Sequence, residues 1–327
     1  MTLPRRRFLH LAAGAAALSA APRIGWAQAY PSKPVRIIVA FGAGGGIDFH
    51  ARLIGQWLTE RLGQTIVVEN RPGAGGNIGT EVALKSPADG YTLFLIFSSH
   101  MINATLFEGK LDFDFLRDTA PVAGIVRLPQ VVMVNPSFEA KTLPELIAYA
   151  KANPGKINFG SGGVGTPGHV AVEQLKMMTG TDMVHVPYRG SAPAMTDLLG
   201  GRLQLNVFNA DSALPQIRAG KVRALAVGNT ERLHVLPDVP TVAETVPGYE
   251  ASLVYGIGAP KGTPPDIVDR LNKEINAGLA DPKIKARLQA AEGLPLTGSA
   301  ADFGKVLQTE TEKWAKVVKF AKLKPRK

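Results

Sequence analysis

The stretch Phe41-Gly42-Ala43-Gly44-Gly45-Gly46-Ile47-Asp48 follows directly on the apolar run from Val35 to Ala40. This order predicts a buried strand, a glycine-rich turn and the start of a helix, with Asp48 as the residue that caps the helix. At such a junction the first backbone N–H groups of the helix have no partner within it, and they lie at the positive end of its dipole. The first glycine turn, residues 41–48, is therefore a candidate anion-binding site.

The second glycine turn has the same arrangement and lies in the other half of the chain. Residues Gly160-Ser161-Gly162-Gly163-Val164-Gly165-Thr166-Pro167-Gly168-His169 follow the short run Ile157-Asn158-Phe159. Thr166 is expected at the N-cap and Pro167 at the first helical position, where its missing N–H is not needed. Two such turns predict two facing loops that hold one anion. Because neither turn contains Lys or Arg, backbone amides would bind that anion, which favours a carboxylate over a triphosphate.

Other interpretations of the two turns remain open at this point. Either turn alone is equally consistent with a structural connection between a strand and a helix. Gly42, Gly44 and the later Glu69 partly match a dinucleotide-binding fingerprint, which would make the chain an exported nucleotide-dependent oxidoreductase. Ile47 stands where that fingerprint needs a third small residue. Around Ser161 the sequence lacks the leading glycine of the G-x-S-x-G hydrolase motif.

The composition is typical of a globular protein that is long enough for two α/β domains. The 327 residues are 45% hydrophobic and 20% charged, which suffices for ordinary buried cores. No cysteine is present, which excludes thiolate catalysis, disulfides and cysteine metal sites. None of the six histidines stands at a spacing that suggests a metal site. The sequence therefore predicts no catalytic residue, no metal and no cofactor.

Residues 1–29 are predicted to be a targeting segment rather than part of the fold. Arg5-Arg6-Arg7-Phe8-Leu9 matches the twin-arginine export pattern, and a short Ala- and Gly-rich stretch from Leu11 to Ala21 follows it. Ala27-Gln28-Ala29 predicts cleavage after its last residue, so the mature chain would begin at Tyr30 in the periplasm. The apolar stretch is shorter than the roughly 20 residues that span a bilayer, which makes an uncleaved anchor the weaker alternative.

The positive charge of the chain belongs partly to this segment. Because residues 1–29 carry four arginines and no acid, the formal net charge falls from +10 to +6 without them. Near the C-terminus, Lys313, Lys316 and Lys319 stand at helical spacing, which predicts a solvated helix face. No basic cluster alternates with aromatic residues, so no nucleic-acid partner is expected.

Strand and helix signals alternate along the mature chain. In its first part the order strand, helix, strand, helix, strand predicts a parallel sheet with helices on both faces. Ser98-Ser99-His100 follows the third of these strands, at an edge of the sheet where ligands often bind. Residues 236–249 are rich in proline and predict a loop. The expected strands are 35–39, 65–69, 91–97, 131–135, 183–186, 203–208 and 222–227, and the expected helices are 48–62, 77–86, 142–152, 264–280, 282–291 and 299–319.

Several motifs, taken in order, resemble one known family. Asn70-Arg71-Pro72-Gly73-Ala74-Gly75-Gly76-Asn77-Ile78-Gly79 precedes Asp89-Gly90-Tyr91-Thr92-Leu93. Two further motifs are Val186-Pro187-Tyr188-Arg189-Gly190 and Ala219-Gly220-Lys221-Val222-Arg223-Ala224-Leu225-Ala226-Val227. Together with the two glycine turns, these motifs resemble the tripartite tricarboxylate transporter receptors, which are Bug-type periplasmic solute-binding proteins. The similarity extends from about Tyr30 to the C-terminal helices.

The resemblance implies an α/β fold of the periplasmic-binding-protein type, a two-lobed Venus flytrap of type II. Each lobe would be a sheet flanked by helices, with the ligand cleft between the lobes. Residues 30–127 and 250–327 would form the first lobe, and residues 128–249 the second. Family members bind small carboxylates and deliver them to a membrane permease, so the resemblance implies a transport receptor and not an enzyme, and we expect a monomer. A receptor that signals to a membrane sensor is a further alternative.

The resemblance also implies a set of ligand-binding residues, because in the family the two glycine turns hold the carboxylate through amides, hydroxyls and water. Ile47 replaces the usual Thr or Ser, and Phe49 and His50 replace small aliphatic residues, which favours a more apolar or aromatic carboxylate. Residues 70–76 are expected to be a structural loop. The expected ligand-binding residues are Phe41, Gly42, Ala43, Gly44, Gly45, Gly46, Ile47, Asp48, Ser98, Ser99, Ser161, Gly162, Gly165, Thr166, His169, Tyr188 and Asn209.

Overall fold

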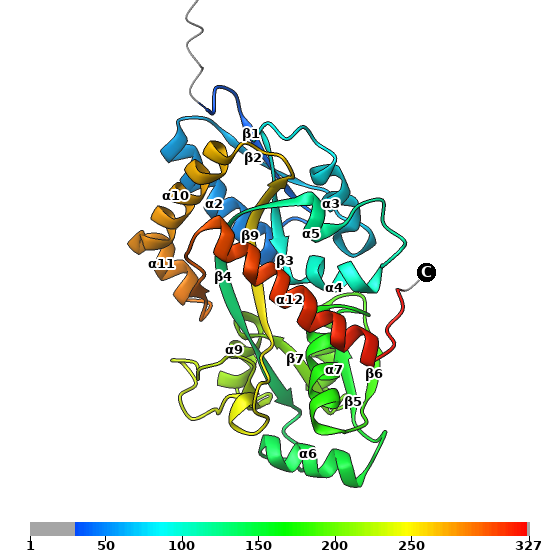
Figure 1. The fold of residues 1–327 in the computed structure, drawn as a ribbon. Coiled ribbons are helices and arrows are strands. Elements are labelled where there is room, and N and C mark those ends of the chain that lie inside the picture. The colour runs from blue at the N-terminus through cyan, green and yellow to red at the C-terminus, as the bar shows by residue number, and fades with distance from the viewer. Residues whose placement is uncertain (1–29, 326–327) are drawn as a thin grey trace, which may run out of the picture. The chain divides into compact units, whose positions relative to one another are not determined.

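The computed structural model describes residues 30–325, so the expected export segment and its cleavage site at Ala29 lie outside the described residues. The described residues from Lys33 onward form one compact unit. Strands and helices alternate through this unit (Figure 1). None of the helices between residues 30 and 325 combines the length and the hydropathy that crossing a membrane requires.

Three parallel strands begin the sheet, as the alternating pattern predicts. Strand β1 (Val35–Val39) pairs in parallel with β2 (Ile66–Asn70) on one side and with β3 (Thr92–Phe97) on the other. Helices α2 (Gly46–Leu62) and α3 (Asn77–Leu84) connect them. Because helices cover both faces of a parallel sheet, β3 is buried along its whole length.

Two long antiparallel strands, which the sequence pattern largely fails to predict, continue the sheet. Strand β9 (Ser252–Pro260) pairs with β3, and β4 (Thr119–Val134) pairs with β9. The first part of β4 pairs with β9 as far as Pro129, and the remainder from Gln130 pairs with β7 (Leu205–Asn209). A single strand therefore runs through both halves of the sheet, and only its last residues are expected as strand from the sequence.

The second half of the sheet repeats the parallel arrangement. Strand β5 (Asn158–Ser161) pairs in parallel with β7 and with β6 (Val184–Pro187), while β8 (Arg223–Val227) pairs antiparallel with the end of β4. The expected lobe boundary near residue 128 falls where β4 changes partners, and the one near residue 250 falls just before β9. That the two halves move as separate lobes stays a prediction.

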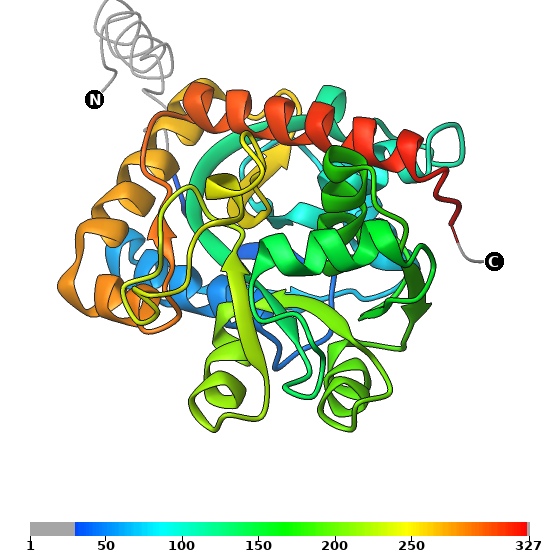
Figure 2. The ribbon, with the colours of Figure 1, turned by 90° about the horizontal axis from the view of Figure 1, so that it is seen from below.

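Helix α12 (Ala300–Phe320) lies across both halves of the sheet (Figures 1 and 2). It packs on α4 (Ser98–Leu106), on β4 and on α7 (Pro167–Thr179), and its Trp314 is buried in the same apolar core as Phe94 of β3. The remaining elements are η1 (Ala74–Gly76), α5 (Phe115–Asp118), α6 (Leu143–Ala152), α8 (Ser191–Leu199), α9 (Ala210–Arg218), η2 (Val242–Glu244), α10 (Pro265–Ala280), α11 (Pro282–Gln289) and β10 (Leu294–Pro295).

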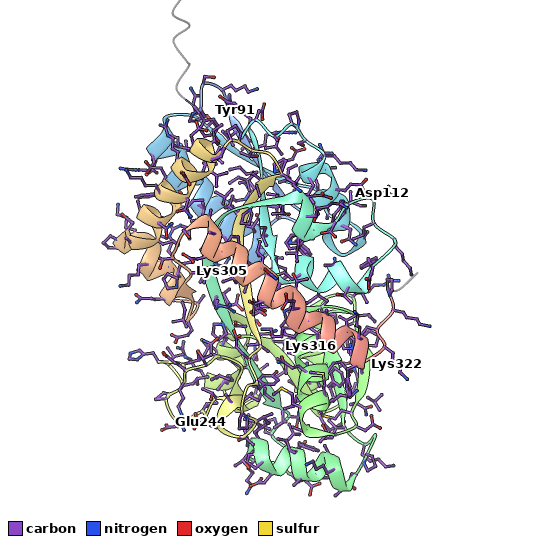
Figure 3. The ribbon with its side chains drawn as sticks, viewed as in Figure 1. Tyr91, Asp112, Glu244, Lys305, Lys316 and Lys322 are labelled. Carbon is purple, nitrogen blue, oxygen red and sulfur yellow. The ribbon has the colours of Figure 1, made fainter. Side chains whose placement is uncertain are left out.

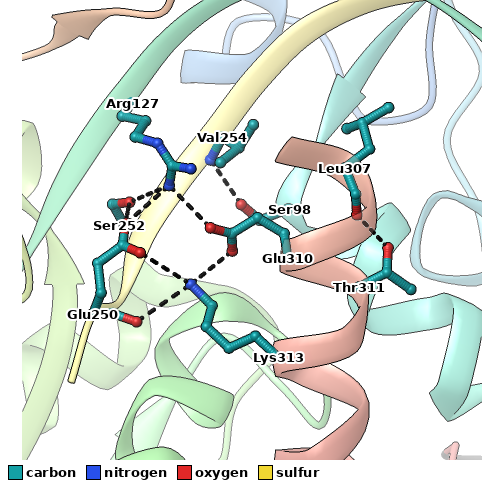
Figure 4. Close-up of polar contacts among 9 residues, drawn as sticks. All are labelled: Ser98, Arg127, Glu250, Ser252, Val254, Leu307, Glu310, Thr311 and Lys313. Atoms are coloured by element: carbon teal, nitrogen blue, oxygen red, sulfur yellow. Dashed lines mark hydrogen bonds and ion pairs between the residues drawn. The ribbon is translucent and has the colours of Figure 1, made fainter. Parts of the chain in front are cut away.

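A charge cluster surrounds the buried Glu310 where β4, β9 and α12 meet (Figure 4), and its other members, Arg127, Glu250 and Lys313, are partly buried. Arg127 of β4 donates to Oε1 of Glu310 at 3.0 Å and to Oε1 of Glu250 at 2.9 Å. Lys313 of α12 lies 2.8 Å from Oε2 of Glu310 and 3.5 Å from Oε2 of Glu250. Burial would raise the pKa of Glu250, but the charges of Lys313 and Arg127 outweigh it and lower that pKa. The side chain of Glu310 is only 3% exposed, so both carboxylates depend on their cationic partners.

The expectation of a uniformly solvated lysine face on the last helix is wrong for one residue. Lys313 belongs to the charge cluster, because the helix turns it toward Glu250 and Glu310. Lys316 and Lys319 are exposed, and Figure 3 shows Lys316 on α12 with Lys322 beyond the end of that helix.

Candidate ligand-binding site

The two glycine turns meet at one cavity of about 330 Å³. Each turn contributes residues just before and at the start of the helix that follows it. The beginnings of α4, α8 and α9, together with parts of β4, β7 and β9, complete the lining. The lining residues are Phe41, Gly42, Gly45, Gly46, Ile47, Phe97, Ser99, Gln130, Gly162, Thr166, Pro167, Gly168, Gly190, Ser191, Val207, Phe208, Asn209, Asp211 and Tyr255.

Helix starts direct the positive ends of their dipoles toward this cavity, whose described lining has no basic side chain. Helices α2, α7 and α8 begin at the cavity, and their N-cap residues Gly45, Thr166 and Gly190 offer no side-chain cap to the first-turn N–H groups. Thr166 has a hydroxyl that could cap, but its Oγ1 donates to the carbonyl oxygen of Gly163 at 2.8 Å instead. Uncapped helix starts are ready-made sites for an anion.

Asp48 fixes the shape of the first turn, and the expectation that it caps the helix is wrong. Helix α2 begins two residues earlier, at Gly46, with Gly45 as its N-cap. The Asp48 carboxylate accepts hydrogen bonds from Gly44 N at 3.0 Å and Arg52 Nε at 2.8 Å. Asn70 Nδ2 donates to its other oxygen at 3.0 Å. Asp48 therefore holds the turn from behind and does not line the cavity.

Asp48→Asn is expected to lower the free energy of unfolding by about 1 to 2 kcal/mol at neutral pH. The hydrogen bond from Arg52, with smaller contributions from Gly44 and Asn70, outweighs burial and lowers the pKa of Asp48 from 3.8 to about 2. Because the pKa is lower in the folded state, this stabilisation is present above the unfolded pKa and is lost as the pH falls toward about 2.

Urea unfolding of the wild type and of Asp48→Asn at several pH values measures this effect. The difference between the two proteins should shrink as the pH falls from about 5 to 3. Asp112, labelled in Figure 3, is an exposed acid outside the cavity, and Asp112→Asn serves as the control. A difference that stays constant with pH would contradict the assigned role of the Asp48 charge.

Buried side chains also hold the second turn in place. Ser161 is fully buried, and its Oγ lies 2.7 Å from Nε2 of His185 and accepts the N–H of Gly163 at 3.1 Å. His169 accepts the N–H of Gly165 at Nδ1, and its ring stacks on His185 with 3.6 Å between the centroids. Burial, followed by the nearby His169, lowers the pKa of His185 to about 3. Ser161 and His169 therefore shape the turn from outside the cavity.

Two further expected residues form structural contacts outside the cavity. Ser98 is the first residue of α4, and its Oγ accepts the N–H of Val254, which ties the start of this helix to β9. Tyr188 donates its hydroxyl to Oδ2 of Asp197 at 2.6 Å. Burial, with a further contribution from Asp197, raises the pKa of Tyr188 to about 12.

The structure thus brings about half of the expected ligand-binding residues to one cavity. Those that line it are Phe41, Gly42, Gly45, Gly46, Ile47, Ser99, Gly162, Thr166 and Asn209, and those that do not are Ala43, Gly44, Asp48, Ser98, Ser161, Gly165, His169 and Tyr188. Direct ligand contact by the first group stays a prediction. In the second group, Asp48, Ser161 and His169 fix the backbone of the turns.

Several lining residues have no signal in the sequence that singles them out. They are Phe97, Gln130, Ser191, Val207, Phe208, Asp211 and Tyr255. Tyr255 is brought to the cavity by β9, a strand that the sequence pattern does not predict. Asp211 lies in the first turn of α9, two residues after Asn209. Its closeness in sequence to this expected ligand-binding residue is the one feature of the sequence that places it near the cavity.

A histidine packs behind the cavity wall beside the first turn. His50 donates from Nδ1 to the carbonyl oxygen of Gly46 at 2.6 Å, and its ring lies over Tyr255 with 4.5 Å between the centroids. Burial lowers the pKa of His50 and raises that of Tyr255, so at neutral pH both rings are uncharged. No group of His, Asp or Glu within residues 30–325 is arranged to hold a metal ion.

Known proteins share the fold or the sequence of this chain over nearly its whole length. The structure of a periplasmic transporter is 40% identical, with a TM-score of 0.79, and the match covers 91% of this chain and 100% of that one. The Rpa4515 protein of R. palustris, solved with adipate, is 36% identical with the same TM-score and coverage. Protein BugT of Bordetella pertussis is 38% identical over 302 residues, which are 91% of this chain and 93% of BugT.

The fold and these likenesses define a solute-binding protein with the α/β fold of periplasmic binding proteins. The sequence model of the family described as tripartite tricarboxylate transporter family receptor matches residues 50–323 of this chain. The chain therefore belongs to this family. The family and the fold class expected from the sequence are confirmed. The chain is a solute-binding receptor and not an enzyme, so the interpretation of the first turn as part of an oxidoreductase is wrong.

Proposed function

We propose that this receptor captures a small carboxylate in the cavity between the two glycine turns and delivers it to the membrane subunits of a tripartite transporter. The mature chain would act in the periplasm as a monomer, after twin-arginine export and cleavage following Ala29. The observation that carries the proposal is the convergence of the uncapped starts of α2, α7 and α8 on one cavity.

A carboxylate suits this cavity better than a phosphate ester does. No Lys or Arg is among the described residues that line the cavity, so only backbone N–H groups, hydroxyls and helix dipoles would neutralise the ligand. Such groups match a single negative charge, whereas a phosphate ester carries more charge and commonly recruits a basic side chain. The adipate bound by the Rpa4515 protein supports the same ligand class.

Lobe closure would couple ligand capture to recognition by the membrane subunits. The connections between the two halves of the sheet include β4 and the chain that enters β9. A ligand that contacts both turns binds the closed form more tightly than the open form, and it shifts the equilibrium by that difference in affinity.

Thermal unfolding of the chain from Tyr30 onward tests the proposal. A panel of mono-, di-, tri-, amino- and aromatic carboxylates is added in turn, with NAD as a non-carboxylate control. A ligand at about 100 times its dissociation constant adds roughly 2.7 kcal/mol of stability and raises the melting temperature by several degrees. Stabilisation by one class of carboxylate is the expected result. A protein that no member of the panel stabilises would contradict the proposal.

A further inference from the structure

The cavity contains an acidic side chain, although its helix starts suit an anion. Asp211 lies in the first turn of α9 and lines the cavity. Within the described lining, Asp211 and Tyr255 are the titratable residues, and no Lys, Arg or His accompanies them. Arg189 is exposed next to the lining residue Gly190, but it is not part of the lining itself.

Asp211 defines one end of the cavity. A Cβ atom built on Gly46 would lie 3.9 Å from Oδ2 of Asp211 and 4.0 Å from the hydroxyl oxygen of Tyr255. These two side chains and the start of α2 therefore share one end of the cavity, which we call the Asp211 end. Oδ1 of Asp211 accepts the N–H of Ser212 at 2.6 Å, and among residues 30–325 no hydrogen bond to Oδ2 is found.

The starts of α7 and α8 define a second end. A Cβ atom built on Gly162 would lie 3.3 Å from Oγ of Ser191 and 3.4 Å from the backbone of Gly190. Gly162 belongs to the second glycine turn, and Ser191 is the first residue of α8. This end, which we call the Ser191 end, combines uncapped N–H groups with a hydroxyl and contains no acid among its described residues.

The two ends have opposite preferences for charge. At the Ser191 end the helix dipoles favour a carboxylate. At the Asp211 end a second carboxylate would face the carboxylate of Asp211, whose exposed side chain still repels a like charge in direct contact with it. An ammonium group at the same place would donate a charge-assisted hydrogen bond to Oδ2.

We infer that the ligand is an aminocarboxylate, bound with its carboxylate at the Ser191 end and its ammonium group at the Asp211 end. The inference rests on the proposed function, since it divides the same cavity into two subsites. Apolar side chains such as Phe97, Val207 and Phe208 line the cavity as well, and they suit the methylene chain that separates the two charged groups.

Matched pairs of ligands test the inference, because the members of each pair have the same number of carbons and differ at one end, where an aminomethyl group replaces a carboxylate. The pairs are malonate with β-alanine, succinate with γ-aminobutyrate, glutarate with δ-aminovalerate, and adipate with ε-aminocaproate. Dissociation constants for the wild type are measured by calorimetry for every pair. In the pair whose length fits the cavity, the aminocarboxylate is expected to bind at least about tenfold more tightly than the dicarboxylate.

The variant Asp211→Asn tests whether the charge of Asp211 causes the preference for the aminocarboxylate over the dicarboxylate. The amide keeps the size of the side chain and can still accept the N–H of Ser212. In this variant the ratio of the dicarboxylate to the aminocarboxylate dissociation constant should fall by about tenfold or more. The aminocarboxylate should bind more weakly and the dicarboxylate more tightly. Asp112→Asn removes one exposed negative charge outside the cavity and should keep the wild-type preference.

The possible failures are distinguishable. If dicarboxylates bind the wild type as tightly as their partners and Asp211→Asn leaves the ratio unchanged, the inference is overturned while the proposed function stands. Equal gains in affinity for both members of a pair in Asp211→Asn would also overturn it, because Asp211 would then only compete with the ligand. If no carboxylate of any class binds, the proposed function itself is wrong.

Discussion

Ser191→Asp is expected to weaken carboxylate binding by about 100-fold or more. The substitution places a negative charge at the first residue of α8, on the cavity wall beside Gly162. An acid in the first turn of a helix is itself favourable, and Ser191 is exposed, so the variant should fold with normal stability. The loss would be specific to the ligand, because the new carboxylate competes with it for the same N–H groups.

Ser191→Asn provides the matched control, since it adds the same number of atoms without the charge. Calorimetry with the tightest-binding carboxylate of the panel should give at most a modest loss for this variant. Near-identical dissociation constants for Ser191→Asp and the wild type would place the ligand elsewhere. Equal and large losses in both variants would mean that size rather than charge is responsible.

Arg127→Met is expected to lower the free energy of unfolding by about 3 kcal/mol. The guanidinium is the shared partner of Glu250 and Glu310 in the charge cluster (Figure 4). Without Arg127, Lys313 would be the cation left beside the two carboxylates. Because the side chain of Glu310 is only 3% exposed, hydration cannot replace its lost ion pair. Denaturant unfolding measures the change directly.

Two further variants separate the cluster from a general effect of losing an arginine. Arg117→Met breaks a pair between a mostly exposed arginine and the half-buried Asp118 and should lower stability less than Arg127→Met does. The double variant Arg127→Met/Glu310→Leu removes one positive and one negative charge, so it should be more stable than Arg127→Met alone. Glu310→Leu alone completes the cycle. If the loss of unfolding free energy in the double variant equals the sum of the losses in the two single variants, Arg127 and Glu310 do not interact energetically.

The elements that the sequence predicts well carry their signals locally. Strand β1 is a short apolar run that ends at a glycine turn, and its predicted bounds agree with the structure. Helix α6 has its capping residue Thr142 and a proline in its first turn, as expected. The glycine turns were recognisable for the same reason, because turn chemistry depends on adjacent residues.

Strands β9 and β4 are hard to predict because tertiary contacts determine them. All nine residues of β9 are buried, so the strand shows no alternation of polar and apolar positions. It also contains Gly256, where a Cβ would lie 2.1 Å from the ring of Phe303, and this contact is invisible in the sequence. In β4 the pairing with β9 shifts register near Pro121 and Gly124, and both residues argue against a strand when read locally.

The misassignment of Asp48 has a similar cause. A polar residue after a run of glycines is a good N-cap candidate, but the glycines themselves enter the helix and move its start to Gly46. The Asp48 side chain then reaches back to Gly44 and across to Asn70, which lies on the neighbouring strand. Only the pairing of β1 with β2 brings Asn70 within reach.

The pairing of β3 with β9 also sets the time at which the protein can finish folding. Phe94 of β3 lies opposite Gly258, so the two partners are 258 − 94 = 164 residues apart, about half of the chain. A ribosome that has made only β1 to β3 holds a sheet with an open edge strand that is apolar from Leu93 to Phe97, which is a hazard for aggregation. That edge is covered only when residues 252–260 emerge. Folding must therefore wait until synthesis has passed residue 260 of 327, and contacts of such long range make it slow.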